Sequence, residues 1–248
     1  MLVHQLIIRE EKRNAINPDI IHAFKDSVNT LKLDAPTLIL RGAGKIFCAG
    51  GDLQWMRSGL TASFEEAKKE TALFGSLFQT LYDYPGIVIC AVQGRAMGGA
   101  LGLVCTADFV VAERSAQFCF SEVKLGIAPS IIAPYVLSRA NNSVVREWMM
   151  NGELFNGEQA QRAQIVSKPC ETGALDEATE ELVIQLEANG PEAMRSTKEL
   201  QRYFSKRPGW DDLCDWTYSK NASLRRSEEG QEGMRAFLEK RRPRWIQA

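Results

Sequence analysis

The residues with the clearest chemical potential lie in a glycine-rich stretch, "AVQGRAMGGALGLVCTAD", at positions 91–108. An apolar run precedes the stretch and a helix-like apolar run leaves it, so we predict a strand-to-helix turn. Its glycines are Gly94, Gly98, Gly99 and Gly102. A backbone with so few side chains lets another group approach closely. The turn itself offers no acid, base or nucleophile, so its own chemistry is that of backbone N–H groups.

Two nucleotide-binding interpretations of this turn fail on spacing. The dinucleotide fingerprint G-x-G-x-x-G requires offsets that the glycines of the stretch do not provide. A phosphate-binding loop requires G-x-x-x-x-G-K-[ST]. The pair Gly44–Lys45 is followed by Ile46, and no glycine stands five residues before it.

The third interpretation is an oxyanion hole. A helix that begins near Gly98–Gly99 presents unpaired N–H groups and a partial positive charge to an oxygen that becomes negative during a reaction. From this turn alone, tight helix–strand packing explains the glycines equally well. A second glycine turn, "FCAGGD" at 47–52, also joins a predicted strand to a helix. Two such turns can direct two N–H donors at one carbonyl oxygen, which suits a thioester that becomes an enolate when C2 gains or loses a proton.

Composition narrows the class of protein. The 248 residues carry a formal net charge of −1, which is a poor match to nucleic acid or an anionic membrane. Six cysteines without a C-x-x-C pair, and no visible secretory signal, favour reduced thiols and a cytoplasmic protein. The longest apolar runs fall short of the ~20 residues that a membrane span needs.

The two histidines, His4 and His22, have no neighbouring acid or cysteine cluster. A histidine-based metal site or a Ser–His–Asp triad is therefore not expected. Acid–base chemistry falls to carboxylates, tyrosine, lysine or cysteine.

Strands and helices are predicted to alternate around the two turns, which indicates α/β layering. Expected strands cover 2–10, 36–42, 86–92, 109–113 and 116–122, and expected helices cover 17–32, 53–59 and 64–84. The first of these helices is expected to have Asn17 as its N-cap and Pro18 at its first helical position. The chain is predicted to be mostly helical from Ser143 onward. We expect an α/β core over 1–190 and a helical region over 191–248 of the same fold. Such an extension commonly serves oligomerisation, or is simply more core.

Several pieces of the chain, taken in order, resemble the enoyl-CoA hydratase/isomerase (crotonase) family. They are "KRNAIN", "GKIFCAGGDLQWM", "AVQGRAMGGALGLVCTAD", "AQFCFSEVKLGIAP", "NGELFNGEQAQRAQIV" and "EEGQEGMRAFLEKRRP". Together they cover nearly the whole chain. The resemblance implies a crotonase-like spiral of β-β-α units, a C-terminal helical trimerisation region, a homotrimer or dimer of trimers, and an acyl-CoA substrate.

The resemblance also implies roles for individual positions. It makes the Gly51 and Gly99 amides the oxyanion hole. It places along the substrate and its coenzyme A moiety Arg13, Ala15, Ala49, Gly50, Asp52, Leu53 and Gly98. A helix cap explains Asp52 equally well, and core packing is the alternative for Leu53.

The family often uses two glutamates, of which this chain keeps one. The first matches Glu122 in "FSEVKLG", while the position of the second is Gly102. Apolar neighbours such as Phe120 and Val123 are expected to raise the pKa of the Glu122 carboxyl and suit it to proton transfer. A surface or capping glutamate is the alternative.

One carboxylate supports either water addition at C2=C3 or proton transfer between C4 and C2. "FCFSEVKLGIAPSIIAPYVL", "GGALGL" and "EANGPEAMRSTKEL" resemble bacterial methylglutaconyl-CoA or carboxygeranoyl-CoA hydratases of leucine and terpene catabolism. We therefore expect a cytoplasmic hydratase of a branched or carboxylated acyl-CoA, such as 3-methylglutaconyl-CoA. It would need no metal and no cofactor beyond the coenzyme A of its substrate.

Three alternatives stay open. The first is a Δ3–Δ2 enoyl-CoA isomerase, and the second is a polyketide β-branching dehydratase or decarboxylase that acts on a carrier-protein thioester. The third is a non-catalytic acyl-CoA or RNA-binding scaffold, although the near-zero net charge disfavours nucleic acid.

The two ends of the chain add two expectations. The chain starts at what resembles the family's second strand, so a sheet edge there would be open or covered by another subunit. The basic tail "EKRRPR" either binds phosphate or complements a helix C-terminus.

Overall fold

The computed structural model describes residues 3–31, 37–58 and 61–246. Two compact units make up the chain, residues 2–179 and residues 180–248. The boundary falls within helix α8 (Leu175–Glu187). Among the described residues, no helix is both long and apolar enough to cross a membrane.

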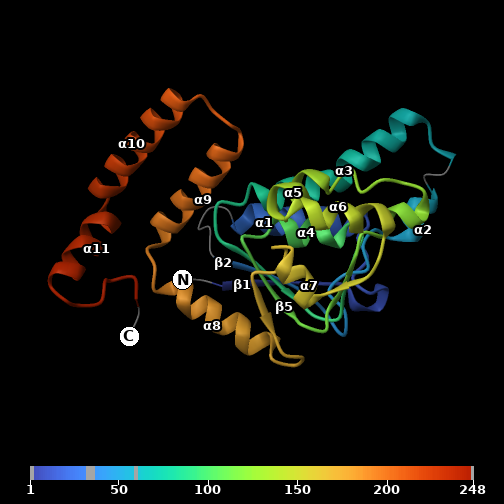
Figure 1. Ribbon diagram of the computed structural model, residues 1–248, viewed down its shortest axis with the longest axis horizontal. Coiled ribbons are helices and arrows are strands. Elements are labelled where there is room, and N and C mark those ends of the chain that lie inside the picture. Colours follow the sequence, from blue (N-terminus) through green and yellow to red (C-terminus); the bar gives the residue numbers. More distant parts are fainter. Residues whose placement is uncertain (1–2, 32–36, 59–60, 247–248) are drawn as a thin grey trace. The chain divides into compact units, whose positions relative to one another are not determined.

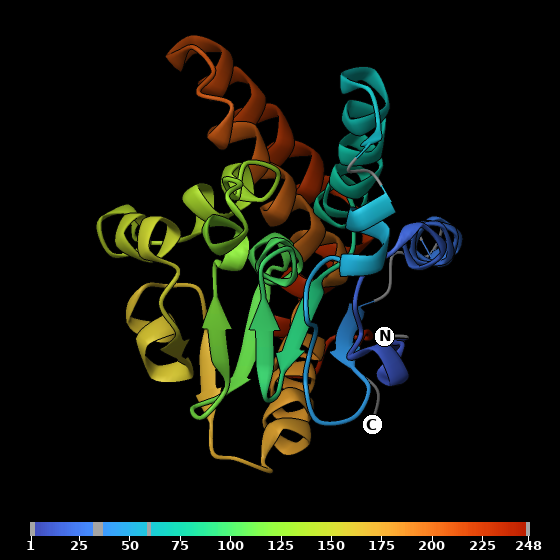
Figure 2. The ribbon, with the colours of Figure 1, turned by 90° about the vertical axis from the view of Figure 1, so that its right-hand side faces the viewer.

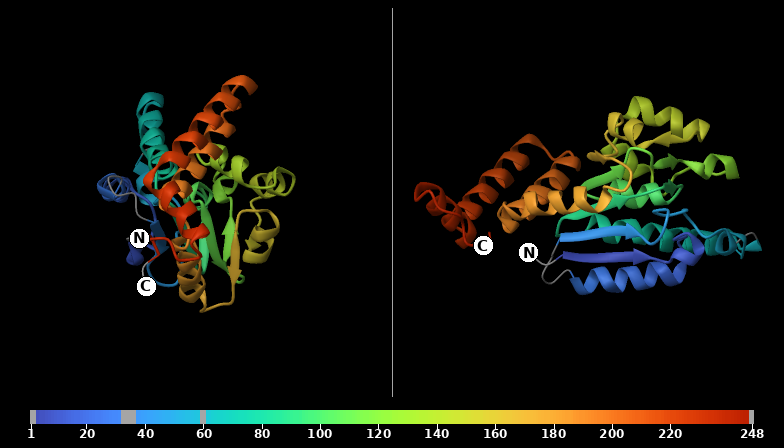
Figure 3. Two further views of the ribbon diagram at one scale, coloured as in Figure 1. Left: turned by 90° about the vertical axis from the view of Figure 1, so that its left-hand side faces the viewer. Right: turned by 90° about the horizontal axis from the view of Figure 1, so that it is seen from below.

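The first unit is built on a five-stranded parallel sheet (Figures 1 and 2). Its strand order is β1 (Val3–Ile8), β2 (Thr37–Gly42), β3 (Val88–Val92), β5 (Phe109–Glu113) and β8 (Lys168–Cys170). β1 lies at one edge and runs beside β2 (Figure 3, right). β2 and β3 are runs of apolar residues and are almost wholly buried, as a parallel sheet covered on both faces requires.

A smaller sheet includes three residues of the predicted glycine turn at 91–108 and part of the strand predicted over 116–122. It contains β4 (Arg95–Met97), β6 (Gln117–Cys119) and β7 (Phe155–Asn156). β4 pairs with β6 in parallel, and β6 pairs with β7 antiparallel. The strand expected over 116–122 therefore ends at Cys119, and a 3₁₀ helix, η3 (Ser121–Leu125), takes its place.

Helices connect the strands of the first unit. They are α1 (Pro18–Leu31), α2 (Leu53–Ser58), α3 (Phe64–Tyr82), α4 (Ala100–Thr106), α5 (Ala133–Arg139), α6 (Asn142–Asn151) and α7 (Gly157–Arg162). The predicted start of α1 is confirmed, because the Asn17 side chain accepts a hydrogen bond from the Ile20 N–H at 3.0 Å. α5 was not predicted. A proline stands in its first turn, where the missing N–H costs nothing.

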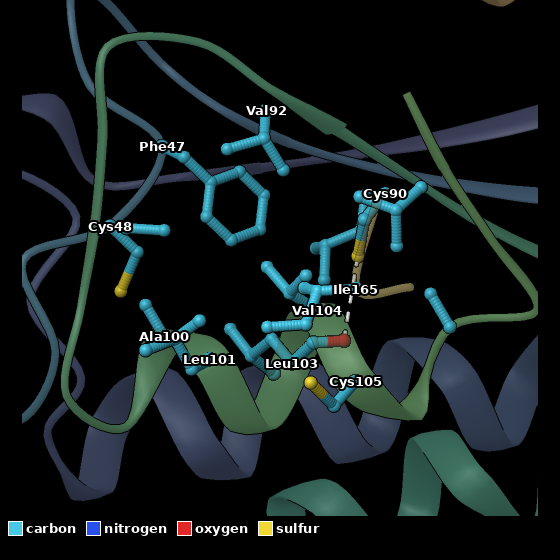
Figure 4. Packing of buried hydrophobic residues seen from close by; sticks show 14 of the residues in the cluster. Phe47, Cys48, Cys90, Val92, Ala100, Leu101, Leu103, Val104, Cys105 and Ile165 are labelled. Atoms are coloured by element: carbon cyan, nitrogen blue, oxygen red, sulfur yellow. Dashed lines mark hydrogen bonds between the residues drawn. The ribbon is translucent and has the colours of Figure 1, made fainter. Parts of the chain in front are cut away.

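The core of the first unit lies between the large sheet and α4. All seven residues of α4 are buried, and Figure 4 shows Phe47 and Cys48 across from Ala100 and Leu101 of that helix. All six cysteines are free, and five of them are buried. Burial raises the pKa of Cys48 to about 12. Thiols in such surroundings act as small apolar side chains, as predicted from their sequence context.

The second unit is helical. After the end of α8 it contains α9 (Pro191–Ser205), α10 (Trp210–Arg226) and α11 (Glu228–Leu238). The basic tail folds back on α11, because Arg241 donates two hydrogen bonds to Glu232 at 2.6 and 3.0 Å and one to Glu239 at 2.7 Å. Arg241 also lowers the pKa of Glu232 to about 2. The charge of Arg241 is therefore paired with carboxylates of its own unit. Phosphate binding by the tail stays a prediction.

Candidate active site

Backbone hydrogen bonds join the two glycine turns side by side. The Phe47 N–H donates to Gln93 O at 3.0 Å, and the Cys48 N–H donates to Arg95 O at 3.1 Å. In the other direction the Met97 N–H donates to Cys48 O at 3.0 Å. Residues 47–48 thus extend the edge of β4, which fixes the register between the turns.

This register brings Gly51 and Gly99 together. Cys48 and Ala96 form an isolated parallel bridge, and each of the two glycines lies three residues beyond one member of that bridge. Gly99 is also the residue before α4, where a helix leaves N–H groups unpaired. In the described part of the chain, neither glycine N–H donates to a backbone or side-chain acceptor. Both glycines border the same cavity, and their role as an oxyanion hole stays a prediction.

The glycine that precedes each donor has a backbone conformation that other residues rarely adopt. φ is +90° at Gly50 and +51° at Gly98. A Cβ at Gly50 would lie 2.6 Å from Met97 O and 3.5 Å from the Gly99 nitrogen. Any side chain at position 50 would therefore push the two turns apart.

Asn14 holds the loop that carries the first turn. This buried side chain donates through Nδ2 to the carbonyls of Ala43 and Ile46, each at 2.9 Å, and of Phe47 at 3.1 Å. The Ala49 N–H donates to Arg13 O at 3.0 Å, which ties down the next part of the loop. Sequence reasoning matched "KRNAIN" to the family but gave Asn14 no role. The only signal available was a polar residue within that motif.

Glu122 lies next to the second turn. Its Oε1 is 3.5 Å from the position of a Cβ at Gly98, so the carboxylate is adjacent to the Gly99 donor. Its Oε2 is buried and has no hydrogen-bond partner among the described residues. Desolvation raises the pKa of this carboxyl, as expected from its sequence neighbours. The predicted neighbour Phe120 is fully buried.

A cavity of about 640 Å³ connects these groups. Of the predicted site residues its wall contains Arg13, Ala49, Gly50, Gly51, Leu53, Gly98, Gly99 and Glu122. Ala15 and Asp52 do not belong to that wall. The Asp52 carboxylate accepts the Gln54 N–H at 2.8 Å and so caps α2, which was the structural alternative for this residue. The predicted coenzyme A contacts of all these residues stay predictions.

The cavity wall also contains residues that the sequence did not single out. Trp55 and Phe74 meet edge to face, with ring centroids 5.9 Å apart. The Phe74 ring lies 2.5 Å from the position that a Cβ at Gly99 would occupy, so it packs directly on the second turn. Ile131 and Ile132 complete this apolar side. These contacts join distant parts of the chain, and periodicity within one helix does not reveal them.

Two apolar side chains fill the space beside Gly102. A Cβ at this position would lie 2.6 Å from both the Ile132 Cγ2 and the Phe78 Cε1 atoms. Both distances are shorter than real Cβ contacts. The place of the family's second glutamate therefore has no room even for a methyl group.

The first unit is an α/β fold in which one cavity is bordered by two glycine turns and by the half-buried side chain of Glu122. Residues 3–248 match the family model described as enoyl-CoA hydratase/isomerase, and the chain belongs to this family. The predicted α/β crotonase-like fold is confirmed by solved structures such as AtuE from Pseudomonas aeruginosa. That structure is 31% identical, with a TM-score of 0.94, over 99% of this chain and 96% of its own.

Two relatives show the range of reactions in the family. Carnitinyl-CoA dehydratase of Salmonella typhi is 32% identical over 97% of this chain and 94% of its own length. The trans-2-decenoyl-[acyl-carrier-protein] isomerase of Streptococcus mutans serotype c is 28% identical over 96% of this chain and 91% of its own length. The protein is therefore an enzyme of the hydratase and isomerase type.

Proposed function

We propose that the protein is a hydro-lyase that adds water to, or removes it from, the C2=C3 bond of an enoyl-CoA. The amides of Gly51 and Gly99 would bind the thioester oxygen, and Glu122 would be the single acid–base group. The observation that carries the proposal is the position of Glu122. Its carboxylate, partly desolvated and without a partner at Oε2 among the described residues, lies beside Gly98 and borders the same cavity as Gly51 and Gly99, which supports this role.

In the hydration direction, the Glu122 carboxylate accepts a proton from a water molecule while the water oxygen forms a bond to C3. The electron pair of the C2=C3 bond moves toward C2 and the thioester carbonyl, which gives an enolate held by the two amides. The protonated Glu122 then gives its proton to C2. Water is consumed, a 3-hydroxyacyl thioester forms, and the carboxylate is regenerated.

The raised pKa of Glu122 suits both halves of this cycle. Each direction begins with the ionised carboxylate as a base and proceeds through the protonated form as an acid. Because a pKa closer to the working pH makes both forms accessible, partial burial of this group favours turnover.

We further propose a branched or carboxylated acyl group, such as that of 3-methylglutaconyl-CoA. The apolar side of the cavity, with Phe74, Ile131 and Ile132, would accommodate a branch. Arg95 and Lys124 also belong to the cavity wall and would attract a carboxylate. Comparing turnover of crotonyl-CoA, 3-methylglutaconyl-CoA and a 3-enoyl-CoA tests this assignment.

A Δ3–Δ2 isomerase is the second candidate, because one carboxylate suffices to move a proton from C4 to C2. The isomerase of Streptococcus mutans supports this alternative. The name of that enzyme gives an acyl-carrier-protein substrate, so the set of tested substrates also includes a carrier-protein thioester.

The assembly and compartment belong to the same proposal. A homotrimer or a dimer of trimers follows from the family resemblance. A cytoplasmic location is supported by six free cysteines.

Replacing Glu122 by glutamine tests the proposed role directly. We expect Glu122→Gln to lower kcat by about 10² to 10⁴, because the acid–base group is lost while shape is kept. Binding of crotonyl-CoA, measured by calorimetry, should persist. Glu147→Gln, the same change on the exposed face of α6, is the matched control. Turnover like that of the wild type in Glu122→Gln would refute the assignment.

A further inference from the structure

Ser121 lies beside the reacting carboxylate, at the start of η3. Its Oγ is 2.9 Å from the position of a Cβ at Gly98, and the Glu122 Oε1 is 3.5 Å from that same point. Both side chains are half-buried and belong to the cavity wall. Because Gly98 has no Cβ, the hydroxyl and the carboxylate both pack close to this turn while they border the same cavity.

The Ser121 hydroxyl has no hydrogen-bond partner in the part of the chain that the structure describes. It does not cap η3 either, because that helix begins after Phe120 without a side-chain cap. Serine hydroxyls near a helix start commonly bond to the backbone, so an uncommitted one in a cavity is available for a ligand.

We propose that the Ser121 hydroxyl binds the reacting water together with Glu122. This inference rests on the proposed hydration. The position that the family resemblance gives to a second glutamate is Gly102, where Phe78 and Ile132 leave no room for a side chain, so no second carboxylate helps Glu122 to hold the water there. A water molecule donates one hydrogen bond to the Glu122 carboxylate and the other to Ser121 Oγ. With both hydrogens held, a lone pair of the water oxygen points at C3.

The proton balance of the reaction is unchanged by this contact. Glu122 takes the proton that leaves the water and later gives it to C2. Ser121 only accepts a hydrogen bond, which passes to the new C3 hydroxyl, and it neither gains nor loses a proton overall. The contribution of Ser121 therefore lies in orientation of the water, and it should appear in kcat.

Ser121→Ala tests the proposal, because alanine keeps the Cβ beside Gly98 and removes only the hydroxyl. The probe is whichever of crotonyl-CoA and 3-methylglutaconyl-CoA the wild type hydrates faster. We expect kcat to fall about tenfold or more, the effect of losing one hydrogen bond to a reacting group, while KM changes less than about twofold. Ser121→Thr, which retains a hydroxyl, should recover part of kcat. Ser138→Ala, an exposed serine of α5, is the control.

The outcomes separate this inference from the proposed function. An unchanged kcat in Ser121→Ala, while Glu122→Gln is inactive, overturns the role of Ser121 alone. A rise in KM with kcat retained, or failure of Ser121→Thr to recover any rate, overturns it too, because a structural or binding role gives those results. If the wild type hydrates neither probe, or if Glu122→Gln keeps its turnover, the proposed function itself fails.

Discussion

At the scale of a single residue, the surroundings of Glu122 favour the protonated form of its carboxyl more than water does. Its Oε2 is buried without a partner, and desolvation raises the pKa of the carboxyl. A surface or capping glutamate, the alternative considered from the sequence, would have water or a backbone N–H at this oxygen. Desolvation is the largest cause of the shift, so ionisation of Glu122 costs folding free energy while it prepares a proton-transfer group.

This cost predicts a pH-dependent stability difference. A carboxyl whose native pKa is raised contributes most to stability below its unfolded pKa, about 4.3, and that contribution is lost as the pH rises through the native value. Glu122→Gln cannot ionise, so we expect its free energy of unfolding, relative to the wild type, to increase over that window. Urea unfolding at pH 4 and pH 7 measures the difference. The free energy of unfolding of the Glu147→Gln control, relative to the wild type, should show no such increase. A Glu122→Gln protein that becomes less stable relative to the wild type as the pH rises would contradict the account.

At the scale of elements, the site depends on α3 lying over the glycine turn. Phe74 and Phe78 of that helix meet edge to face, with centroids 5.2 Å apart, and they pack on Gly99 and Gly102 respectively. Helix α3 therefore packs on the turn that contains Gly99 and fills the space beside Gly102, the position that the family resemblance gives to a second glutamate.

Two glycine-to-alanine variants in helices test this packing. Gly102→Ala should destabilise the protein by about 1–3 kcal/mol, because its Cβ meets Phe78 and Ile132 too closely. Gly75→Ala, also in a helix, meets only Ile131 Cγ2 at an ordinary 3.5 Å and should gain up to about 1 kcal/mol from helix propensity. Chemical denaturation measures both. A Gly102→Ala protein as stable as Gly75→Ala would mean that position 102 has room after all.

How much of this arrangement could be predicted depends on the range of the contacts. The strand before each turn and the Asn17 cap of α1 follow from local pattern, and the structure contains both strands and the cap. β4 could not be predicted, because three residues become a strand only through partners supplied by Cys48 and by β6. The packing of Phe78 and Ile132 against Gly102 could not be predicted either, because these residues lie in three different segments of the chain.

At the scale of the whole molecule, the helical second unit presents large apolar side chains to its surroundings. Its most exposed examples, all at least 70% exposed, are Trp210, Tyr218, Phe237 and Leu238. Exposed aromatic and aliphatic groups of this kind are commonly covered by another chain. They support the proposal of a homotrimer or a dimer of trimers.

We therefore expect light scattering after size-exclusion chromatography to give three or six subunits for the wild type. Phe237→Asp should lower that number or make it depend on protein concentration, because a charge would be buried in the contact. Asp211→Asn, on an exposed polar residue of α10, is the control. A wild-type protein that is monomeric at micromolar concentration would contradict the proposed assembly.

The source of oxygen in the product tests the central claim most directly. The reaction is run in H₂¹⁸O with the tested thioester that the wild type converts fastest, and the product is analysed by mass spectrometry. A single-glutamate hydratase predicts a 3-hydroxyacyl product that carries ¹⁸O at C3, and it predicts that Glu122→Gln forms no such product. An unlabelled 2-enoyl product formed from a 3-enoyl-CoA, without any hydroxyacyl product, would contradict the account and identify an isomerase.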